Sequence, residues 1–271
     1  MEARGLRLAS AAMLEHCSDV LQIGLPEGDR AILRDILDRC FAPSDLLIAD
    51  HEPVVPRVFV SDMDSTMISA ECIDELADFA GIKDQIAAIT ERAMQGELDF
   101  ESALRERVGL LRDLPESAIG QCLAERIAPM PGARVLVATL KARGCHTVLV
   151  TGGFHHFADP VAEQLGFERV VGNRLEIGDG RLTGGLVGAI TDSAVKKATL
   201  LAEMAELGES AASLATGDGA NDIPMIEAAT YGIAYYAKPK AREASDGWID
   251  RGDLTSVLQL LGIPRAEWVW E

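Results

Sequence analysis

Two aspartates that could do chemistry, Asp62 and Asp64, stand one residue apart directly after a short apolar run, Val58 to Val60. A β-branched run of this length is typical of a buried parallel strand, and ligands of open α/β sheets bind at the carboxyl ends of such strands. Carboxylates this close repel each other unless a cation or a proton intervenes. The pair therefore predicts a site for a hard divalent cation; a solvated turn or a helix N-cap, where Asp and Ser are also common, is the alternative.

A calcium-binding loop of the EF-hand type does not fit this stretch. Such a loop needs Gly at its sixth position and Glu at its twelfth. Counted from Asp62, these positions hold Met67 and Ile73. The EF-hand alternative is therefore excluded.

A second apolar run, residues 213–216, leads into Gly-Asp-Gly-Ala-Asn-Asp at residues 217–222. A turn rich in Gly and Asn could explain this stretch on its own. The same order of strand and then acid occurs at both places, however, and this favours one metal site built from two strand ends. Because every candidate ligand is an oxygen and no His or Cys falls in either stretch, the expected cation is Mg²⁺ rather than zinc.

Two further stretches suit a phosphate group. Thr151, Gly152 and Gly153 follow an apolar run where a strand is expected to give way to a helix, so a hydroxyl and backbone N–H groups could bind phosphate there. Gly also serves such turns for purely steric reasons. Lys196 and Lys197 lie at the expected start of a helix, which is the unfavourable end of the helix dipole for a cation. A lysine in that place is typical of an anion site, and a solvated helix face is the alternative.

Taken together, these stretches resemble a known family. Asp-Met-Asp-Ser-Thr at 62–66, Thr151, Lys196 and the 217–222 stretch are similar to the four motifs of the haloacid-dehalogenase-like phosphatases, and residues 71–75 resemble the phosphoserine phosphatase branch. The resemblance covers about residues 58–262. It implies an α/β fold with a Rossmann-like parallel sheet core. It also implies Mg²⁺-dependent hydrolysis of phosphoserine to L-serine and phosphate through an aspartyl-phosphate, the last step of serine biosynthesis.

The resemblance implies a role for each matched residue. Asp62 is expected to be the nucleophile, and Asp64 the acid that protonates the leaving group and later activates water. Four aspartates are expected to bind Mg²⁺: Asp62, Asp64, Asp218 and Asp222. Asp64 is expected to contribute its backbone carbonyl, and the others their carboxylates. The expected phosphate-binding residues are Thr151, Gly152, Gly153, Lys196 and Asn221.

Between residues 70 and 128 the apolar spacing predicts four helices, which are too many for a single crossover between strands. We therefore expect a helical cap inserted into the core. The predicted units are a small N-terminal appendage of unknown role at 1–55, a core at 56–69 and 129–271, and the cap at 70–128.

The resemblance places substrate specificity in this cap. Glu71 suits a substrate ammonium group, and Arg107 suits a carboxylate through a two-pronged guanidinium contact. Met94 and Phe100 are expected to be apolar walls of the pocket. The alternative for the first two is an ordinary charge on an exposed helix face, and for the last two it is ordinary helix core.

Outside the cap, the pattern of apolar and turn residues predicts the remaining elements. The helices are expected over 31–41, 133–142, 154–165, 191–207 and 253–262. The strands are expected over 45–49, 145–151, 168–172, 232–236 and around Trp248, with a hairpin over 173–187.

The composition limits the partners. The 271 residues carry a formal charge of −18, and the isoelectric point is about 4.7, so the basic surface that nucleic acid requires is not expected. No run approaches the roughly 18 apolar residues of a membrane span. The five cysteines form no C-x-x-C pair and predict buried thiols in a reducing compartment. We expect a cytoplasmic monomer or homodimer that binds a small phosphomonoester.

Other functions stay open at this stage. One is a phosphotransferase, or a phosphatase for another small phospho-amine or phospho-amino acid; another is a regulatory or binding protein that has the fold without the chemistry. The intact residues Asp62, Asp64, Lys196 and Asp218 argue against the last. Thr151, where this branch of the family more often has Ser, and Tyr231, expected to add bulk near the last motif, depart from the pattern.

Overall fold

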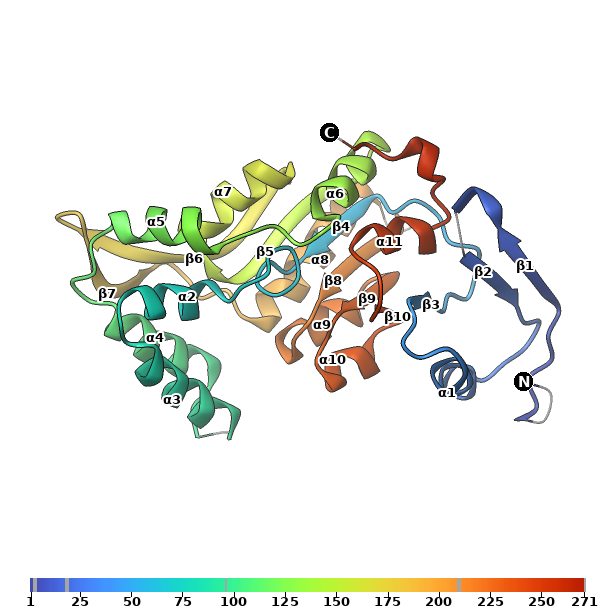
Figure 1. Cartoon of the computed structure of the whole chain (residues 1–271), viewed down its shortest axis with the longest axis horizontal. Helices are drawn as coiled ribbons and strands as arrows, with labels where there is room; N and C mark the ends of the chain where they lie inside the picture. Colours follow the sequence, from blue (N-terminus) through green and yellow to red (C-terminus); the bar gives the residue numbers. More distant parts are fainter. Residues whose placement is uncertain (2–3, 18–19, 96, 209–210, 271) are drawn as a thin grey trace.

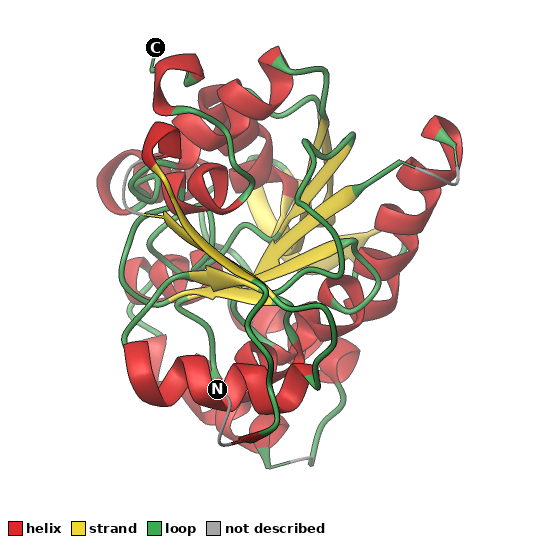
Figure 2. Ribbon diagram, turned by 90° about the vertical axis from the view of Figure 1, so that its right-hand side faces the viewer, coloured by secondary structure: helices red, strands yellow, loops and turns green. Residues whose placement is uncertain are grey.

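The computed structural model describes residues 1, 4–17, 20–95, 97–208 and 211–270. Its centre is an eight-stranded sheet with helices on both faces (Figures 1 and 2). In spatial order the strands are β3 (Leu46–Leu47), β10 (Gly247–Ile249), β9 (Tyr231–Tyr235), β8 (Ser213–Gly217), β4 (Val58–Ser61), β5 (His146–Phe154), β6 (Arg169–Gly178) and β7 (Arg181–Val187). The strands from β10 to β6 run parallel, and the edge strands β3 and β7 are antiparallel. The predicted α/β fold with a mainly parallel sheet is confirmed.

Both faces of this sheet are buried, and the side chains of its central strands alternate between two apolar clusters. Phe59 and Leu149 point into the larger cluster, with residues of α6, α7 and α11, whereas Val60 and Val148 pack with residues of α8 and α9. This explains why the central strands read as continuous apolar runs. The helices are α6 (Ala133–Ala142), α7 (His155–Leu165), α8 (Ser193–Leu207), α9 (Ile223–Ile226), α10 (Pro239–Ala244) and α11 (Thr255–Leu260).

Four helices separate β4 from β5, as the sequence predicts: α2 (Cys72–Phe79), α3 (Lys83–Met94), α4 (Phe100–Leu110) and α5 (Ser117–Arg126). The α3–α4 pair extends away from the sheet, beyond β7 (Figure 1). The loop between α4 and α5 is tied to β7 by backbone hydrogen bonds, because Asp113 N–H donates to Leu182 O (2.8 Å) and Leu182 N–H donates to Leu114 O (2.9 Å). The predicted division of the chain into three units stays a prediction.

The N-terminal segment joins the opposite edge of the sheet. An antiparallel pair, β1 (Ser10–Leu14) and β2 (Val20–Gly24), precedes α1 (Arg30–Phe41) and the edge strand β3. The guanidinium carbons of Arg34 in α1 and Arg242 in α10 lie 4.4 and 4.0 Å from the ring centroid of Trp248 in β10. The cation–π contact of Arg34 holds the segment against the core.

The structure differs from several sequence predictions. β5 continues through the turn expected at 151–153, because the strand shifts register after Val150 and pairs again at Phe154 with Asn173. The strand expected over 45–49 is limited to Leu46–Leu47, and Cys40 is exposed rather than buried. The β1–β2 pair and the short helices α9 and α10 were not predicted. Among the described residues, no helix has both the length and the hydropathy that a membrane crossing requires.

The contact between β9 and α9 gives a test of this packing. A Cβ atom added at Gly232 would lie 2.3 Å from Ile226 O, whereas one added at Gly120, on the exposed face of α5, meets nothing within 4 Å. We expect Gly232→Ala to lower the free energy of unfolding by about 1–3 kcal/mol, as overpacking does. Gly120→Ala should raise it by about 0.5–1 kcal/mol, because Ala favours the helix. Urea unfolding of both variants measures this, and equal stabilities would contradict the described packing.

Candidate active site

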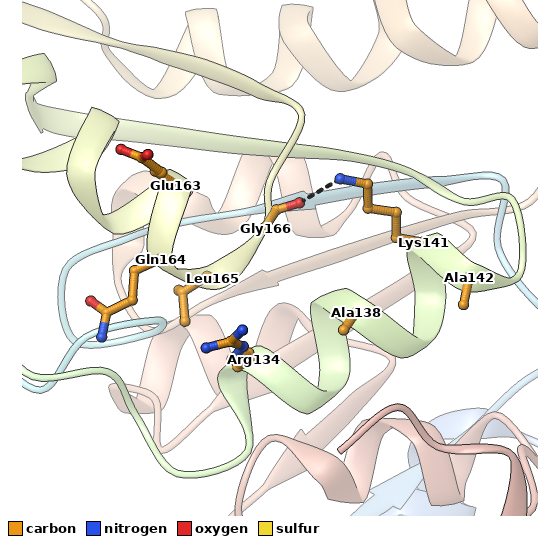
Figure 3. Close-up of a pocket in the computed structure, with 8 residues that line it drawn as sticks. All are labelled: Arg134, Ala138, Lys141, Ala142, Glu163, Gln164, Leu165 and Gly166. Carbon is orange, nitrogen blue, oxygen red and sulfur yellow. Dashed lines mark hydrogen bonds between the residues drawn. The ribbon is translucent and has the colours of Figure 1, made fainter. Parts of the chain in front are cut away.

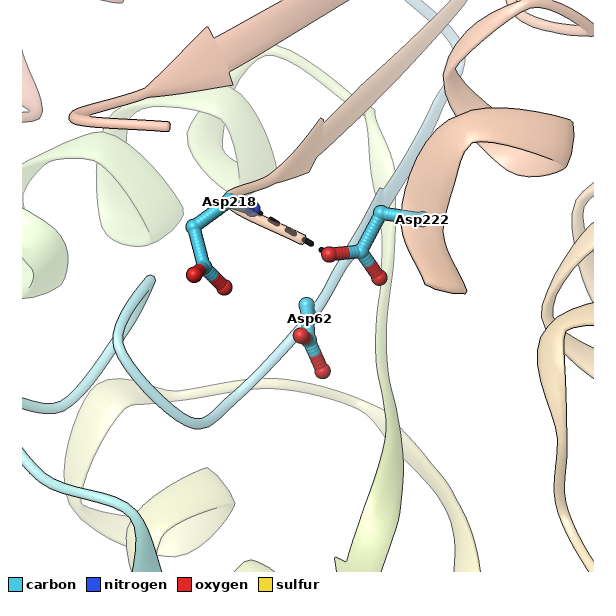
Figure 4. Close-up of side chains that lie close together, drawn as sticks. All are labelled: Asp62, Asp218 and Asp222. Atoms are coloured by element: carbon cyan, nitrogen blue, oxygen red, sulfur yellow. Dashed lines mark hydrogen bonds between the residues drawn. The ribbon is translucent and has the colours of Figure 1, made fainter. Parts of the chain in front are cut away.

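The two acidic stretches meet because β4 and β8 are neighbouring parallel strands. Ser61 pairs with Thr216, and Asp62 N–H extends the ladder by donating to Thr216 O (3.0 Å). The chain leaves β4 toward β5 on one side and later returns to β8 on the other, so a crevice forms at the carboxyl ends between them. One carboxylate oxygen each of Asp62, Asp218 and Asp222 lies within 4.8 Å of the other two (Figure 4).

Lys196 is buried between two of these carboxylates. Its Nζ lies 2.6 Å from Asp62 Oδ1 and 2.7 Å from Asp222 Oδ1. The second oxygen of Asp222 accepts the backbone N–H groups of Asp218 (3.1 Å) and Gly219 (3.0 Å). Burial alone would lower the pKa of Lys196, but the two carboxylates outweigh it and hold that pKa above its usual range. Lys196 therefore stays a cation.

Asp62 is buried in a position that restricts its carboxylate. Its Oδ1 accepts the backbone N–H of Met63 (2.8 Å) in addition to the contact with Lys196. Burial raises the pKa of Asp62 well above its usual value, repulsion from Asp222 raises it further, and Lys196 opposes both. With Oδ1 held by these donors, the orientation of the carboxylate is fixed before any ligand binds.

Asp64 lies on the cap side of the same strand end. Its Oδ1 accepts Cys72 N–H (3.1 Å) at the start of α2, and its Oδ2 accepts the Thr151 hydroxyl (3.3 Å). A Cβ atom at Gly153 would lie 2.8 Å from Asp64 Oδ2, so only glycine leaves room for the carboxylate. Burial, with added repulsion from Glu71, raises the pKa of Asp64 to about 6. Such a carboxyl group can carry a proton near neutral pH and act as a general acid.

A cavity of about 130 Å³ opens at this place and joins the strand ends to the cap. The residues that line it are Asp62, Asp64, Glu71, Ile73, Phe100, Leu104, Arg107, Thr151, Gly152, Gly153, Phe154, Asp218, Asn221 and Lys238. The cavity thus brings together most of the site residues predicted from the sequence. Lys196 and Asp222 are buried without lining it, and the side chain of Met94, at the end of α3, lies outside what the structure describes.

The cap end of the cavity carries charges of both signs. Glu71 accepts a hydrogen bond from the Ser65 hydroxyl (2.8 Å). Arg107 uses Nε to donate to Ala103 O (3.3 Å), which leaves its two terminal amino groups for other partners. Burial lowers the pKa of Arg107, and Asp74 and Glu71 act against this. The cavity therefore offers the carboxylate of Glu71 and the guanidinium group of Arg107 in addition to the acids at the strand ends.

Comparison with known proteins identifies the family. The model of the haloacid dehalogenase-like hydrolases matches residues 59–227, which is more than half of the chain. The chain belongs to the haloacid dehalogenase-like hydrolase family. In this family member the matched region runs from β4 through the cap to α9 and includes both acidic stretches.

Individual members of the family resemble the chain over most of its length. A phosphoserine phosphatase of Albidiferax ferrireducens is 42% identical over 236 residues, which is 85% of this chain and 97% of that protein. A phosphoserine phosphatase of Mycobacterium tuberculosis is 40% identical over 252 residues, but the chain spans only 61% of its length. The crystal structure of a haloacid dehalogenase family hydrolase of Salmonella enterica superposes with a TM-score of 0.81 at 29% identity, over 95% of this chain and 89% of that one.

The donor set of this hydrolase fits the predicted cation. The clustered ligand atoms of Asp62, Asp218 and Asp222 are all carboxylate oxygens, as Mg²⁺ prefers. Asp222 differs from the other two, because both of its oxygens already accept hydrogen bonds. Its carboxylate therefore positions Lys196 and the 217–219 turn, and Asp62 and Asp218 are better placed to hold a metal.

Four lining residues were missed by the sequence analysis: Ile73, Leu104, Phe154 and Lys238. The first three are apolar residues in or beside elements already predicted, and Lys238 follows β9, the parallel neighbour of β8, so its position after a strand end was the available signal. Tyr231, by contrast, does not line the cavity. It begins β9 at the far end of the strand, where its hydroxyl accepts Val54 N–H (2.9 Å).

A larger hollow of about 370 Å³ lies elsewhere in the hydrolase, between α6 and α7 (Figure 3). Lys141 donates from Nζ to Gly166 O across it (3.1 Å). Its charged side chains, Arg134, Lys141 and Glu163, are exposed. It is a surface groove, because none of the polar side chains that line it is buried.

The buried ion pair predicts a measurable loss of stability. Lys196→Ala would leave Asp62 and Asp222 buried without their cation, which should cost about 3–5 kcal/mol in the free energy of unfolding. Lys197→Ala is the control, because Lys197 is the exposed neighbour in the same helix and should change stability by about 0.5 kcal/mol or less. Urea unfolding in the presence of a chelator measures both, and similar midpoints would refute the pairing of Lys196.

Proposed function

We propose that this chain is a Mg²⁺-dependent phosphoserine phosphatase. It hydrolyses O-phospho-L-serine to L-serine and phosphate through an aspartyl-phosphate, as the last step of serine biosynthesis. The observation that carries the proposal is the single cavity in which Asp62 and Asp64 lie with Glu71 and Arg107. The phosphoserine phosphatases among the relatives of the chain support it.

The reaction begins with Asp62. Its carboxylate attacks phosphorus, so that a bond forms between an oxygen of Asp62 and phosphorus while the bond from phosphorus to the serine oxygen breaks. Asp64, whose pKa is raised to about 6, gives its proton to the departing alkoxide. Asp64 then takes a proton from a water molecule, whose oxygen attacks the phosphorus of the aspartyl-phosphate. The bond between phosphorus and the Asp62 oxygen breaks, which restores the Asp62 carboxylate and releases inorganic phosphate.

Several residues would hold the phosphate group during these steps. Thr151, the backbone at Gly152 and Gly153, and Asn221 line the cavity beside Asp62. Lys196, whose ammonium group contacts the Asp62 carboxylate, would bind a phosphoryl oxygen as well. Asp62, the Asp64 carbonyl and Asp218 would hold Mg²⁺, with Asp222 in support. When bound, Mg²⁺ neutralises negative charge on the phosphoryl oxygens. The donors are oriented in advance, so little reorganisation accompanies the charge that develops on the phosphoryl group.

The amino-acid part of the substrate would lie toward the cap. Glu71 would bind the ammonium group, and Arg107 would bind the carboxylate with the terminal amino groups that its contact to Ala103 leaves available. Phe100 forms an apolar wall, because a Cβ atom at Gly152 would lie 3.2 Å from its ring. Met94 is proposed as a second wall.

The proposal extends to the setting of the enzyme. We place it in the cytoplasm as a monomer or homodimer whose partner is a small phosphomonoester. All five cysteines are free thiols, which agrees with a reducing compartment. The formal charge of −18 disfavours nucleic acid as a partner.

A phosphate-release screen tests the substrate directly. It compares phosphoserine, phosphothreonine and phosphoethanolamine, each with Mg²⁺ and after chelation, and with glycerol or ethanol as a second acceptor. Phosphoserine should be hydrolysed fastest, activity should disappear on chelation and return with Mg²⁺, and the acceptor should take little phosphate. Faster turnover of phosphoethanolamine, or transfer to the acceptor, would favour the alternative functions.

The nucleophile has its own test. Asp62→Asn keeps an oxygen that can accept from Met63 and Lys196 but removes the attacking carboxylate. We expect turnover to fall to background, by about 10³-fold or more, as for loss of a covalent nucleophile. Circular dichroism and the urea midpoint establish that the variant is folded. A folded Asp62→Asn enzyme that keeps substantial activity would overturn the covalent mechanism.

Arg107 tests the assignment of phosphoserine. Arg107→Ala leaves the substrate carboxylate unpaired. For phosphoserine this should weaken transition-state binding, as measured by kcat/KM, by about 2–5 kcal/mol. p-Nitrophenyl phosphate has no carboxylate, so its hydrolysis should change little. Arg105→Ala is the matched control, because Arg105 is on the same helix but pairs with Glu101 at the surface.

The ratio of the two losses is the measurement that decides this prediction. Equal losses for phosphoserine and p-nitrophenyl phosphate in Arg107→Ala would mean that Arg107 supports the cap rather than binding a carboxylate. A loss of the same size in Arg105→Ala would point to general damage of α4.

A further inference from the structure

Lys238 lies at the mouth of the cavity, although its role follows from none of the matched motifs. It stands between β9 and α10, and its backbone N–H donates to Asp218 O (2.9 Å), which ties it to the turn that carries the predicted metal ligands. Two residues before it, Tyr236 adopts a left-handed backbone conformation (φ 41°) that a non-glycine residue rarely takes. The chain therefore turns sharply after β9, and this turn brings Lys238 to the cavity.

The ammonium group of Lys238 is held only loosely. Its Nζ lies 3.8 Å from Asp218 Oδ2, beyond hydrogen-bond distance, and its side chain is 70% exposed. An exposed pair of this kind contributes about 0–1 kcal/mol to stability. Stability therefore does not account for the placement of this cation, and the ammonium can turn to another anion at little cost.

The charges that line the cavity determine which side chains can attract a phosphate group. Four acidic side chains line it, those of Asp62, Asp64, Glu71 and Asp218. A bound Mg²⁺ would offset two of these charges, but the protein as a whole carries a formal charge of −18, so a phosphate dianion that approaches it still meets repulsion. Lys196 is buried between two carboxylates, which offset its charge, so it does not attract an anion to the mouth of the cavity. The cations that line the cavity are Arg107, on the cap, and Lys238, on the core side next to Asp218 and Asn221.

We propose that Lys238 binds the phosphate group of the substrate at the cavity mouth, steers the dianion toward Asp62 and also receives the phosphate product on its way out. Lys238 and Arg107 would then hold the two anionic ends of one ligand from opposite elements. This inference rests on the proposed function for the identity of the amino-acid part, but it depends on the phosphate group alone for its chemistry. Charges at the rim of a site act mainly on association and on its salt dependence.

The test compares Lys238→Gln with Lys240→Gln. Lys240 is two residues away, in the first turn of α10, and is exposed but does not line the cavity, so it matches Lys238 in charge and exposure and differs in position. The measurements are kcat and KM for phosphoserine and for p-nitrophenyl phosphate, and the inhibition constant of inorganic phosphate, each at low and at high salt. The concentration of Mg²⁺ that gives half-maximal activity is measured for each variant.

For Lys238→Gln we expect KM for both substrates and the inhibition constant of phosphate to rise about five- to tenfold at low salt, the size of one lost charge-assisted hydrogen bond. Added salt should reduce the difference in KM and in the inhibition constant between Lys238→Gln and wild type, because salt screens the attraction between Lys238 and the phosphate group. The value of kcat should stay within about twofold, and the Mg²⁺ requirement should not increase. Lys240→Gln should behave as wild type.

Three results would overturn the role of Lys238: identical behaviour of the two variants, a fall in kcat with unchanged KM, or a weaker response to Mg²⁺ with unchanged phosphate inhibition. The last two would assign Lys238 to the metal turn instead. A different result would refute the proposed function. If the wild-type enzyme hydrolyses p-nitrophenyl phosphate but not phosphoserine, phosphoserine is not the substrate. In that case the inhibition by inorganic phosphate still decides the role of Lys238.

Discussion

The contact of Lys196 with two buried carboxylates is the interaction on which the site depends. One ammonium group lies 2.6 Å from Asp62 and 2.7 Å from Asp222, in a place where water does not reach it. Without that cation, two acids at neighbouring strand ends would repel each other in a medium of low polarity. Asp222 in turn receives the backbone N–H groups of the turn that presents Asp218, so the same cation orients both acidic stretches. The geometry of the proposed nucleophile, Asp62, and that of the proposed metal ligands therefore depend on the same contact.

The sheet provides this constraint by its topology. Asp62, Asp218 and Lys238 follow β4, β8 and β9, which are consecutive parallel neighbours, so their strand ends converge although the residues are far apart in the sequence. Residues of α2 and α4 complete the cavity from the other side. Asp64 accepts Cys72 N–H at the start of α2, and this contact couples the position of α2 to the carboxyl group that we propose as the general acid.

Much of this arrangement could be predicted from the sequence, because its signals are local. The run Val58 to Ser61 has the composition of a buried strand, and it is one. The helices α2 to α5 could be predicted from their apolar spacing, because each helix buries its apolar face. Strand-then-acid order, together with the rule that parallel strands end at one edge, was enough to bring the acids together.

The remainder depends on contacts that no local pattern records. The role of Asp222 follows from its pairing with Lys196, which only the fold creates. The position of Lys238 depends on a left-handed residue, Tyr236, in a short loop, and α9 is only 4 residues long, too short for a helical period to show. The β1–β2 pair was not predicted, because its strands are mostly exposed and their apolar residues do not alternate with polar ones.

The two edges of the sheet have a consequence for the solubility of the chain. At one edge β10 is covered by β3, which is only two residues long, and at the other edge the backbone of residues 113–115 pairs with β7, so neither β10 nor β7 presents a free row of N–H and C=O groups along its whole length. Open edges of this kind are templates on which further chains add as strands and aggregate. A shortened chain that begins at Val58 would expose β10 and the aromatic face of Trp248, and it would be prone to self-association even though every residue of the cavity is still present.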